Sequence, residues 1–175
     1  ILNGITDWVY EEEFAVTNLM AWSPDSEYLT YVRFDESEVP EYSMQMWGNG
    51  LYPGYYNFKY PKAGEKNSKV TVHSYSVATK DIKELKVPVE GDYYIPRITF
   101  TTNSDQLAVM TLNRQQNVFN MYYVNPKSGV SRLILRDENK CYVDSEWLTS
   151  IHFNPSGFTY VSEQDGYSHI YLYSP

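Results

Sequence analysis

The sequence predicts an all-β fold made of short antiparallel strands. Tyr, Val, Ile, Thr and Phe fill short alternating runs, and 18 of the 175 residues are tyrosine, which has a high strand preference. No long segment holds the 3.6-residue hydrophobic period of an amphipathic helix. A strand–turn–strand unit also recurs along the chain. Together these observations predict a partial β-propeller of consecutive four-stranded antiparallel blades, part of a larger propeller.

The recurring unit has an aromatic anchor, a polar turn and a second strand. In the first copy, Trp22 is followed by the turn signal Ser23-Pro24-Asp25. The copies occupy residues 20–32, 98–109 and 151–161. The spacing from Phe100 to Phe153 is close to one four-stranded blade, whereas the longer spacing from Trp22 to Phe100 requires an insertion.

Further strands complete the predicted blades. They are expected at residues 70–78, 82–89, 118–124, 130–135 and 168–173. The predicted division is the end of one blade at 1–17, a blade at 18–90 with an inserted arm at about 35–69, the next blade at 91–143, and an incomplete blade at 144–175. Since a propeller needs more blades to close, and the chain starts at Ile1 without a signal-peptide pattern, we expect a piece of a longer protein.

The composition of the chain indicates which kinds of molecule its charge disfavours as binding partners. Hydrophobic residues make up 42% of the chain and charged residues 21%, which is typical of a globular protein. A formal net charge of −8 disfavours nucleic acid or an anionic membrane surface as partner, and no apolar run has membrane-spanning length. Cys141 is the single cysteine, so no intrachain disulfide can form. No acceptable Asn-x-Ser/Thr site is present, in keeping with a bacterial origin.

The stretch Asp7-Trp8-Val9-Tyr10-Glu11-Glu12-Glu13-Phe14 is the strongest candidate for a functional site. Its apolar lead-in favours a strand, in which Glu11 and Glu13 share one side and Glu12 faces the other unless a tight turn intervenes. A run of glutamates is most often a solvated charged surface. Held rigidly beside a cavity, however, two neighbouring carboxylates suit a protonated amine or a guanidinium.

Several segments resemble the β-propeller of the dipeptidyl peptidase IV family, which includes the fibroblast-activation-protein relatives. They are Asn3 to Glu13, Trp22 to Asp25, Arg33 to Tyr42, Tyr60 to Gly64, Phe153 to Gly157 and Gly166 to Ile170. These matches follow in order along the whole chain. The resemblance implies that Glu12 and Glu13 bind the free α-amino group of a peptide substrate, with Glu11 and Phe14 as supporting residues.

The resemblance also implies the activity of a longer parent protein. That parent is expected to be a serine exopeptidase that releases N-terminal dipeptides with Pro or Ala in second position. The resemblance implies that its catalytic triad lies on a separate C-terminal α/β-hydrolase domain, and this chain contains no Gly-x-Ser-x-Gly motif. The chain alone is therefore predicted to be inactive, with no catalytic residue of its own and no cofactor. The competing hypothesis is a non-enzymatic propeller that binds a protein or a glycan.

The same resemblance carries expectations about assembly, location and further contacts. A homodimer is expected through the arm from Phe34 to Gly64, and export to the bacterial periplasm or cell surface is expected. An arginine that relatives supply from an earlier segment lies outside this chain. A Phe-Arg pair that contacts substrate in some relatives should fall between Asp144 and Ile151, where the sequence offers Trp147 and no arginine.

The sequence contains no recognisable pattern of metal-binding residues. His73, His152 and His169 are far apart and lack the spacing of a metal site. The acidic segment at residues 35–38 lacks the spaced ligands and the glycine of a calcium loop. Cys141 follows Lys140 but has no suitably placed base, so it is expected to be structural. No metal site is predicted.

Overall fold

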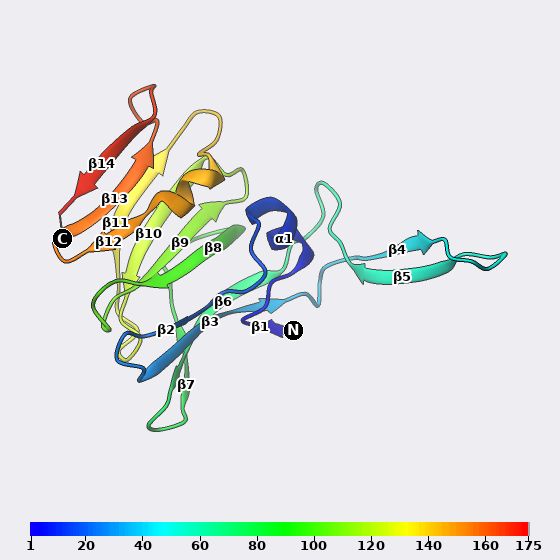
Figure 1. Cartoon of the computed structure of the whole chain (residues 1–175), viewed down its shortest axis with the longest axis horizontal. Coiled ribbons are helices and arrows are strands. Elements are labelled where there is room, and N and C mark those ends of the chain that lie inside the picture. The colour runs from blue at the N-terminus through cyan, green and yellow to red at the C-terminus, as the bar shows by residue number, and fades with distance from the viewer. Residues whose placement is uncertain (175) are drawn as a thin grey trace.

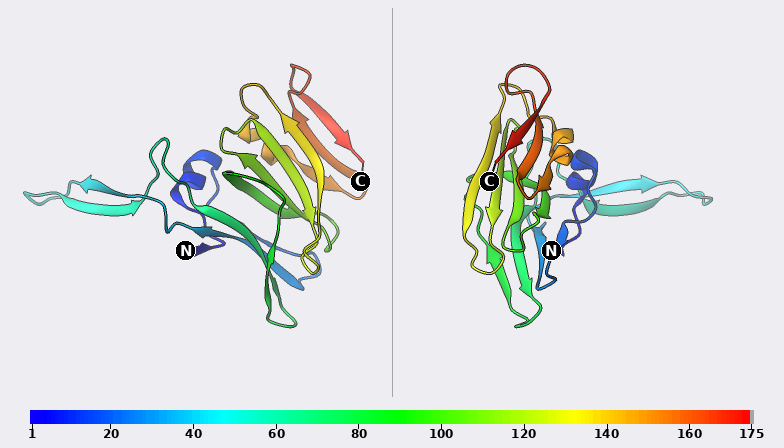
Figure 2. Two further views of the ribbon diagram at one scale, coloured as in Figure 1. Left: turned by 180° about the vertical axis from the view of Figure 1, so that it is seen from behind. Right: turned by 60° about the vertical axis from the view of Figure 1, so that its left-hand side comes forward.

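The computed structural model describes residues 1–174 and is built mainly of antiparallel strands (Figure 1). Three sheets follow one another in chain order, and a two-stranded arm projects from the end near the N-terminus (Figure 2). This confirms the predicted all-β propeller fragment. No helix within residues 1–174 has the length and apolar character needed to cross a membrane.

The first sheet has the strand order β1-β3-β6-β7, with β2 also paired to β3. Its strands are β1 (Leu2–Asn3), β2 (Met20–Trp22), β3 (Tyr28–Asp35), β6 (Lys69–Ser76) and β7 (Ile82–Leu85). The residues of β1 and β2 lie along the same edge of β3, so Leu2 and Asn3 extend this sheet.

The chain leaves this edge at Gly4 and returns at Leu19. The N–H of Gly4 donates to the carbonyl of Val32 at 2.8 Å, and the N–H of Val32 donates to the carbonyl of Leu19 at 3.0 Å. Gly4 has a φ of +74°, and a Cβ at this position would lie 2.4 Å from Cγ of Met20. Only glycine fits this corner, because it tolerates both the backbone angle and the close approach.

The second sheet is a four-stranded meander, and the third has three strands. The second contains β8 (Tyr93–Phe100), β9 (Leu107–Asn113), β10 (Val118–Val124) and β11 (Ser131–Glu138). The third contains β12 (His152–Asn154), β13 (Gly157–Ser162) and β14 (His169–Tyr173), preceded by the 3₁₀ helix η1 (Ser145–Ser150). Pro175, the last residue of the predicted incomplete blade, lies outside the described residues.

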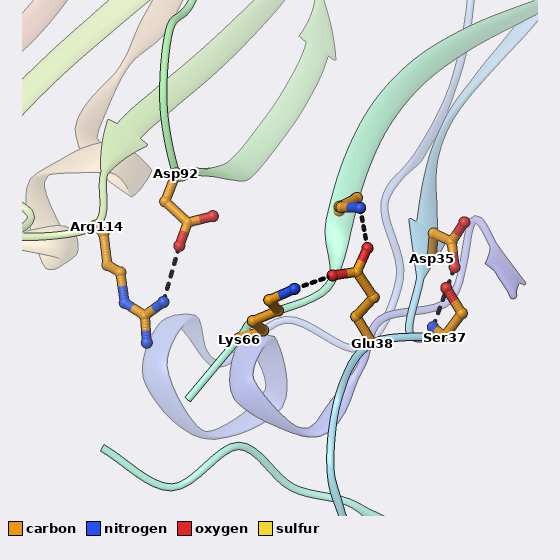
Figure 3. A network of polar contacts seen from close by, with 7 residues as sticks. Asp35, Ser37, Glu38, Lys66, Asp92 and Arg114 are labelled. Carbon is orange, nitrogen blue, oxygen red and sulfur yellow. Dashed lines mark hydrogen bonds and ion pairs between the residues drawn. The ribbon is translucent and has the colours of Figure 1, made fainter. Parts of the chain in front are cut away.

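Between β3 and β6 the chain forms the projecting arm. Its two strands, β4 (Glu41–Met46) and β5 (Gly54–Lys59), pair only with each other, and most of their residues are exposed (Figures 1 and 2). At the arm's root, the carboxylate of Glu38 accepts hydrogen bonds from Lys66 and Lys69 (Figure 3). The entering and returning segments of the arm are thus held together by an ion-pair network.

One continuous core links the three sheets. Alternating residues of the central strands are buried, as in β3, where Val32 and Phe34 have no exposed area. The rings of Phe119 on β10 and Tyr160 on β13 stack with centroids 5.5 Å apart, which joins the second and third sheets. The core therefore holds adjacent sheets in a defined relative position, and residues from different sheets can form one site.

Candidate functional site

The glutamate stretch forms a short α-helix, α1 (Trp8–Phe14), and not the predicted strand. The buried Asp7 carboxylate caps it, since Oδ1 accepts a hydrogen bond from the N–H of Tyr10 at 3.1 Å. Tyr10 and Phe14, four residues apart, point from one side of the helix into the core. Ala15 ends the helix with a φ of +50°. Capping and burial outweigh the strand preference of Trp8, Val9 and Tyr10.

Three contacts fix α1 to distant parts of the chain. Oδ2 of Asp7 accepts a hydrogen bond from the hydroxyl of Ser68 at 2.5 Å, just after the arm returns. The N–H of Ile95 on β8 donates to Oη of Tyr10 at 2.8 Å. At the other end, Nη2 of Arg97 donates to the carbonyl of Phe14 at 2.8 Å. The helix is therefore held against both the first and second sheets.

Glu12 and Glu13 line the same hollow, which we call the glutamate hollow. It has a volume of about 490 Å³ and is lined by Glu12, Glu13, Phe14, Ala15, Arg97, Ser145, Glu146, Trp147, Thr149 and Ser150. Both glutamates are exposed, so their carboxylates are accessible to a ligand. Three elements contribute to the wall: α1, β8 and η1.

Glu11 is placed apart from the other two glutamates. It lines a second hollow of about 600 Å³ at the arm's root, together with Leu2, Thr6, Asp7, Trp8, Glu36, Met44, Met46, Tyr56, Phe58 and Lys59. The expectation that Glu11 and Glu13 share a side while Glu12 faces away is therefore wrong. The reason is the 100° turn per residue of a helix, which replaces the alternation of a strand.

Phe14 lines the glutamate hollow, but its side chain lies in the core. The side chain is 4% exposed and lies edge-on to Tyr10 and Tyr94, with ring centroids 5.3 and 5.2 Å away. A buried ring in this position stabilises α1 and does not present a surface to a ligand. Phe14 thus supports the site through the position of the helix.

Burial shifts the protonation equilibria around the helix start. The pKa of the Asp7 carboxyl is raised above its usual value of 3.8 by burial, although the hydrogen bonds from Ser68 and Tyr10 oppose this shift. Burial also raises the pKa of Glu36, and the charge of Asp7 adds to that shift. On the other side, burial lowers the pKa of Arg97, whose reference value is high enough that it stays protonated at neutral pH.

The structure adds residues that the sequence did not indicate. Arg97 lies on β8, and Gln116, in the turn between β9 and β10, donates a hydrogen bond to the carboxylate of Glu13. Trp147, the residue expected in place of the Phe-Arg pair, lines the glutamate hollow from η1. Arg97 places a guanidinium in the same wall from a different element. Because Arg97 and Gln116 are far from α1 in the sequence, no local pattern could have found these two residues.

The other candidate residues lie elsewhere. His73 is bonded to Thr71 at 2.9 Å and stacks with Tyr31, and burial lowers its pKa. Nε2 of His169 is 3.7 Å from a carboxylate oxygen of Asp165, and Cys141 is exposed. Among residues 1–174, no group of three or more His, Cys, Asp or Glu side chains has the arrangement of a metal site. The glutamate hollow is thus the best supported candidate site.

Comparison with known proteins agrees with this architecture. Residues 1–175 match the family model described as "Dipeptidyl peptidase IV (DPP IV) N-terminal region". The sequence is 34% identical over 188 residues to dipeptidyl peptidase 4 of Trichophyton rubrum, covering 99% of this chain and 24% of the fungal protein. It is 38% identical over 125 residues to prolyl endopeptidase FAP of Mus musculus, covering 67% of this chain and 16% of the mouse protein.

Solved structures give the same result. The crystal structure of Porphyromonas gingivalis dipeptidyl peptidase 4 matches with a TM-score of 0.94 and 61% sequence identity, covering 99% of this chain and 25% of that one. The crystal structure of a putative dipeptidyl aminopeptidase IV from Bacteroides ovatus matches with a TM-score of 0.80 and 26% sequence identity. This match covers 99% of this chain and 24% of the Bacteroides ovatus chain. The chain spans about a quarter of the length of these relatives. It belongs to the dipeptidyl peptidase IV N-terminal region family.

Proposed function

We propose that this chain is the substrate-recognition segment of a larger, exported serine exopeptidase that releases N-terminal dipeptides with Pro or Ala in second position. Glu12 and Glu13 bind the substrate α-amino group. The observation that carries this proposal is that both carboxylates lie on one clamped helix and line one hollow. The family of the relatives supports the peptidase activity of the parent protein.

The chemistry of the hollow suits an ammonium group. A peptide amine has a pKa near 8 and is largely protonated at neutral pH, and two carboxylates favour its charged form further. A carboxylate–ammonium hydrogen bond shielded from water contributes about 1.5 to 3 kcal/mol. Because α1 is fixed at both ends, binding the amine there sets how far the peptide can enter. The catalytic groups, which we place outside this chain, then meet the second peptide bond.

Kinetic comparison of glutamate variants tests this proposal. Replacing Glu12 or Glu13 with Gln in the full-length protein keeps the shape but removes the charge. Each change should lower kcat/KM on a free dipeptide-anilide by about 10- to 150-fold. Glu11→Gln is the matched control, because it makes the same charge change on the same helix but lines the other hollow. Wild-type efficiency in both Glu12→Gln and Glu13→Gln, with the fold intact by circular dichroism, would refute the proposal.

Assembly through the arm is a separate part of the proposal. The two arm strands and the loop between them expose large apolar side chains, which are typical of the centre of a protein interface: Tyr42, Met44, Met46, Trp47, Leu51, Tyr52, Tyr55 and Tyr56. We therefore propose that the full-length protein is a homodimer that uses this arm. Analytical ultracentrifugation of a variant with the arm shortened to its root should show a monomer. A dimer of unchanged stability would exclude this interface.

A further inference from the structure

We propose that Gln116 is a positioning residue that orients the Glu13 carboxylate for the substrate amine without neutralising it. This inference rests on the proposed function. Nε2 of Gln116 donates a hydrogen bond to Oε1 of Glu13 at 2.6 Å, across 103 residues of sequence. The contact joins the turn between β9 and β10 of the second sheet to α1. It engages Oε1 of Glu13, whose side chain is exposed.

The backbone of Gln116 is itself fixed. Its N–H donates to the carbonyl of Asn113 at 2.8 Å, and its own carbonyl accepts from the N–H of Val143 at 2.7 Å. The side chain of Asn113 accepts hydrogen bonds from the N–H groups of Asn117 and Val118 at 3.0 and 2.9 Å. Gln116 has a φ of +55°, an unfavourable angle for a residue with a side chain. The turn maintains this angle and aims the amide at Glu13.

The choice of an amide as donor has a chemical consequence. A glutamine donates a hydrogen bond but carries no charge, so Glu13 keeps its full negative charge for a cationic ligand. A lysine or arginine would pair with the carboxylate and compete with the substrate amine. Glu38 shows this alternative in the same chain, because its hydrogen bonds to Lys66 and Lys69 lower its pKa to about 2.

The nearest cation on the same turn is bonded elsewhere. Arg114 lies two residues before Gln116 and lines a hollow with Glu13. Its guanidinium is bonded through Nη1 to the carboxylate of Asp92 at 2.8 Å (Figure 3). Nη2 of the same guanidinium donates to the carbonyl of Glu65 at 2.5 Å. The turn therefore offers Glu13 a neutral donor while its positive charge is held by other acceptors.

Two substitutions at position 116 of the full-length protein test this inference. Gln116→Met keeps the length but removes the donor, so KM for a free dipeptide-anilide should rise about 3- to 10-fold with kcat little changed. Gln116→Lys keeps a donor but adds a charge beside Glu13, and its loss in kcat/KM should be larger, roughly 10-fold or more. A purely structural contact predicts the opposite order, because Lys can still bond Glu13. Gln45→Met, the same change at an exposed glutamine on β4 of the arm, is the control and should match wild type.

A second substrate separates this inference from the proposed function. On an anilide that lacks the α-amino group, neither position 116 variant should differ from wild type. If Gln116→Met keeps the wild-type KM, or Gln116→Lys equals or exceeds Gln116→Met, the inference is wrong. If Glu13→Gln also leaves the free-amine substrate unaffected, the proposed function is wrong as well. A loss in Glu13→Gln without a loss in Gln116→Met rejects the role of Gln116 alone.

Discussion

The hydroxyl of Ser68 donates a hydrogen bond to the buried carboxylate of Asp7 at 2.5 Å, across 61 residues of sequence. Asp7 caps the helix that carries the candidate glutamates, and Ser68 is the residue before β6, where the chain returns from the arm. One carboxylate thus connects the start of α1 with the end of the arm. The rings of Trp8 and Tyr60, with centroids 4.3 Å apart, provide a second contact between the same two regions.

Loss of the Asp7 cap should loosen α1. Asp7→Ala removes the acceptor for the Tyr10 N–H and for the Ser68 hydroxyl, and loss of a helix cap costs about 0.5 to 2 kcal/mol. Asp7→Asn keeps an acceptor for the cap and should cost less. Hydrogen-exchange mass spectrometry of the full-length protein should show faster exchange in residues 8–14, most in Asp7→Ala. Equal exchange in Asp7→Ala and wild type would show that the cap does not hold the helix.

The Asp7 contribution should depend on pH in a defined direction. Burial raises the pKa of Asp7 in the folded state above 3.8, so the folded helix binds its proton more tightly than the opened one. Stability is therefore lost as pH rises from 3.8 through the folded pKa. Protection of residues 8–14 in wild type, measured relative to Asp7→Asn at each pH, should fall over this window. A relative protection that rises with pH would contradict the sign of this shift.

Tyr10→Phe tests the contact between α1 and the second sheet. The substitution keeps the buried ring but removes the hydroxyl that accepts from the Ile95 N–H. A buried N–H left without a partner costs about 1 to 3 kcal/mol. We expect faster exchange of residues 8–14 and of the amides around Ile95, detected by the same mass spectrometric measurement. Faster exchange confined to only one of the two segments would show that they are not coupled.

Arg97→Met tests the contact at the end of the helix. Methionine fills much of the arginine's volume but cannot donate to the carbonyl of Phe14. Since Phe14 and Arg97 both line the glutamate hollow, water should replace part of the lost bond, and the cost should be about 1 kcal/mol. We expect KM for a free dipeptide-anilide to rise about 5-fold, and Arg97→Lys to recover part of the loss. An unchanged KM in Arg97→Met would show that Arg97 does not contribute to substrate binding.

The strands were predictable because their signals are local. In β3, alternating buried residues such as Val32 and Phe34 follow directly from the pleat. The turn before β3 is equally local, since Ser23 Oγ donates to Asp25 at 2.6 Å and accepts from the N–H of Tyr28 at 2.9 Å. These contacts span five residues or fewer, so the sequence pattern contains them.

The helix and its surroundings could not be predicted in the same way. Trp8 to Tyr10 favour a strand by their intrinsic preference. The Asp7 cap that opposes it is local, but the other contacts that hold the helix come from Ser68, Ile95 and Arg97. Each lies more than 60 residues away in the sequence. Only the family resemblance predicted that Glu12 and Glu13 act together. The helix that places both of them on one hollow could be seen only in the folded structure.

The edge of β3 has a consequence for how recognition can diversify. Gly4 and Leu19 both bond to Val32, so the excursion between them leaves and rejoins the sheet at a single residue. An excursion whose two ends meet at one point can change in length and content while the pairing of β3 with β6 stays intact. Within residues 5–18, however, Tyr10 and Phe14 belong to the core and Asp7 is bonded to Ser68, so variation that keeps the fold is confined to exposed positions such as Glu11, Glu12 and Glu13.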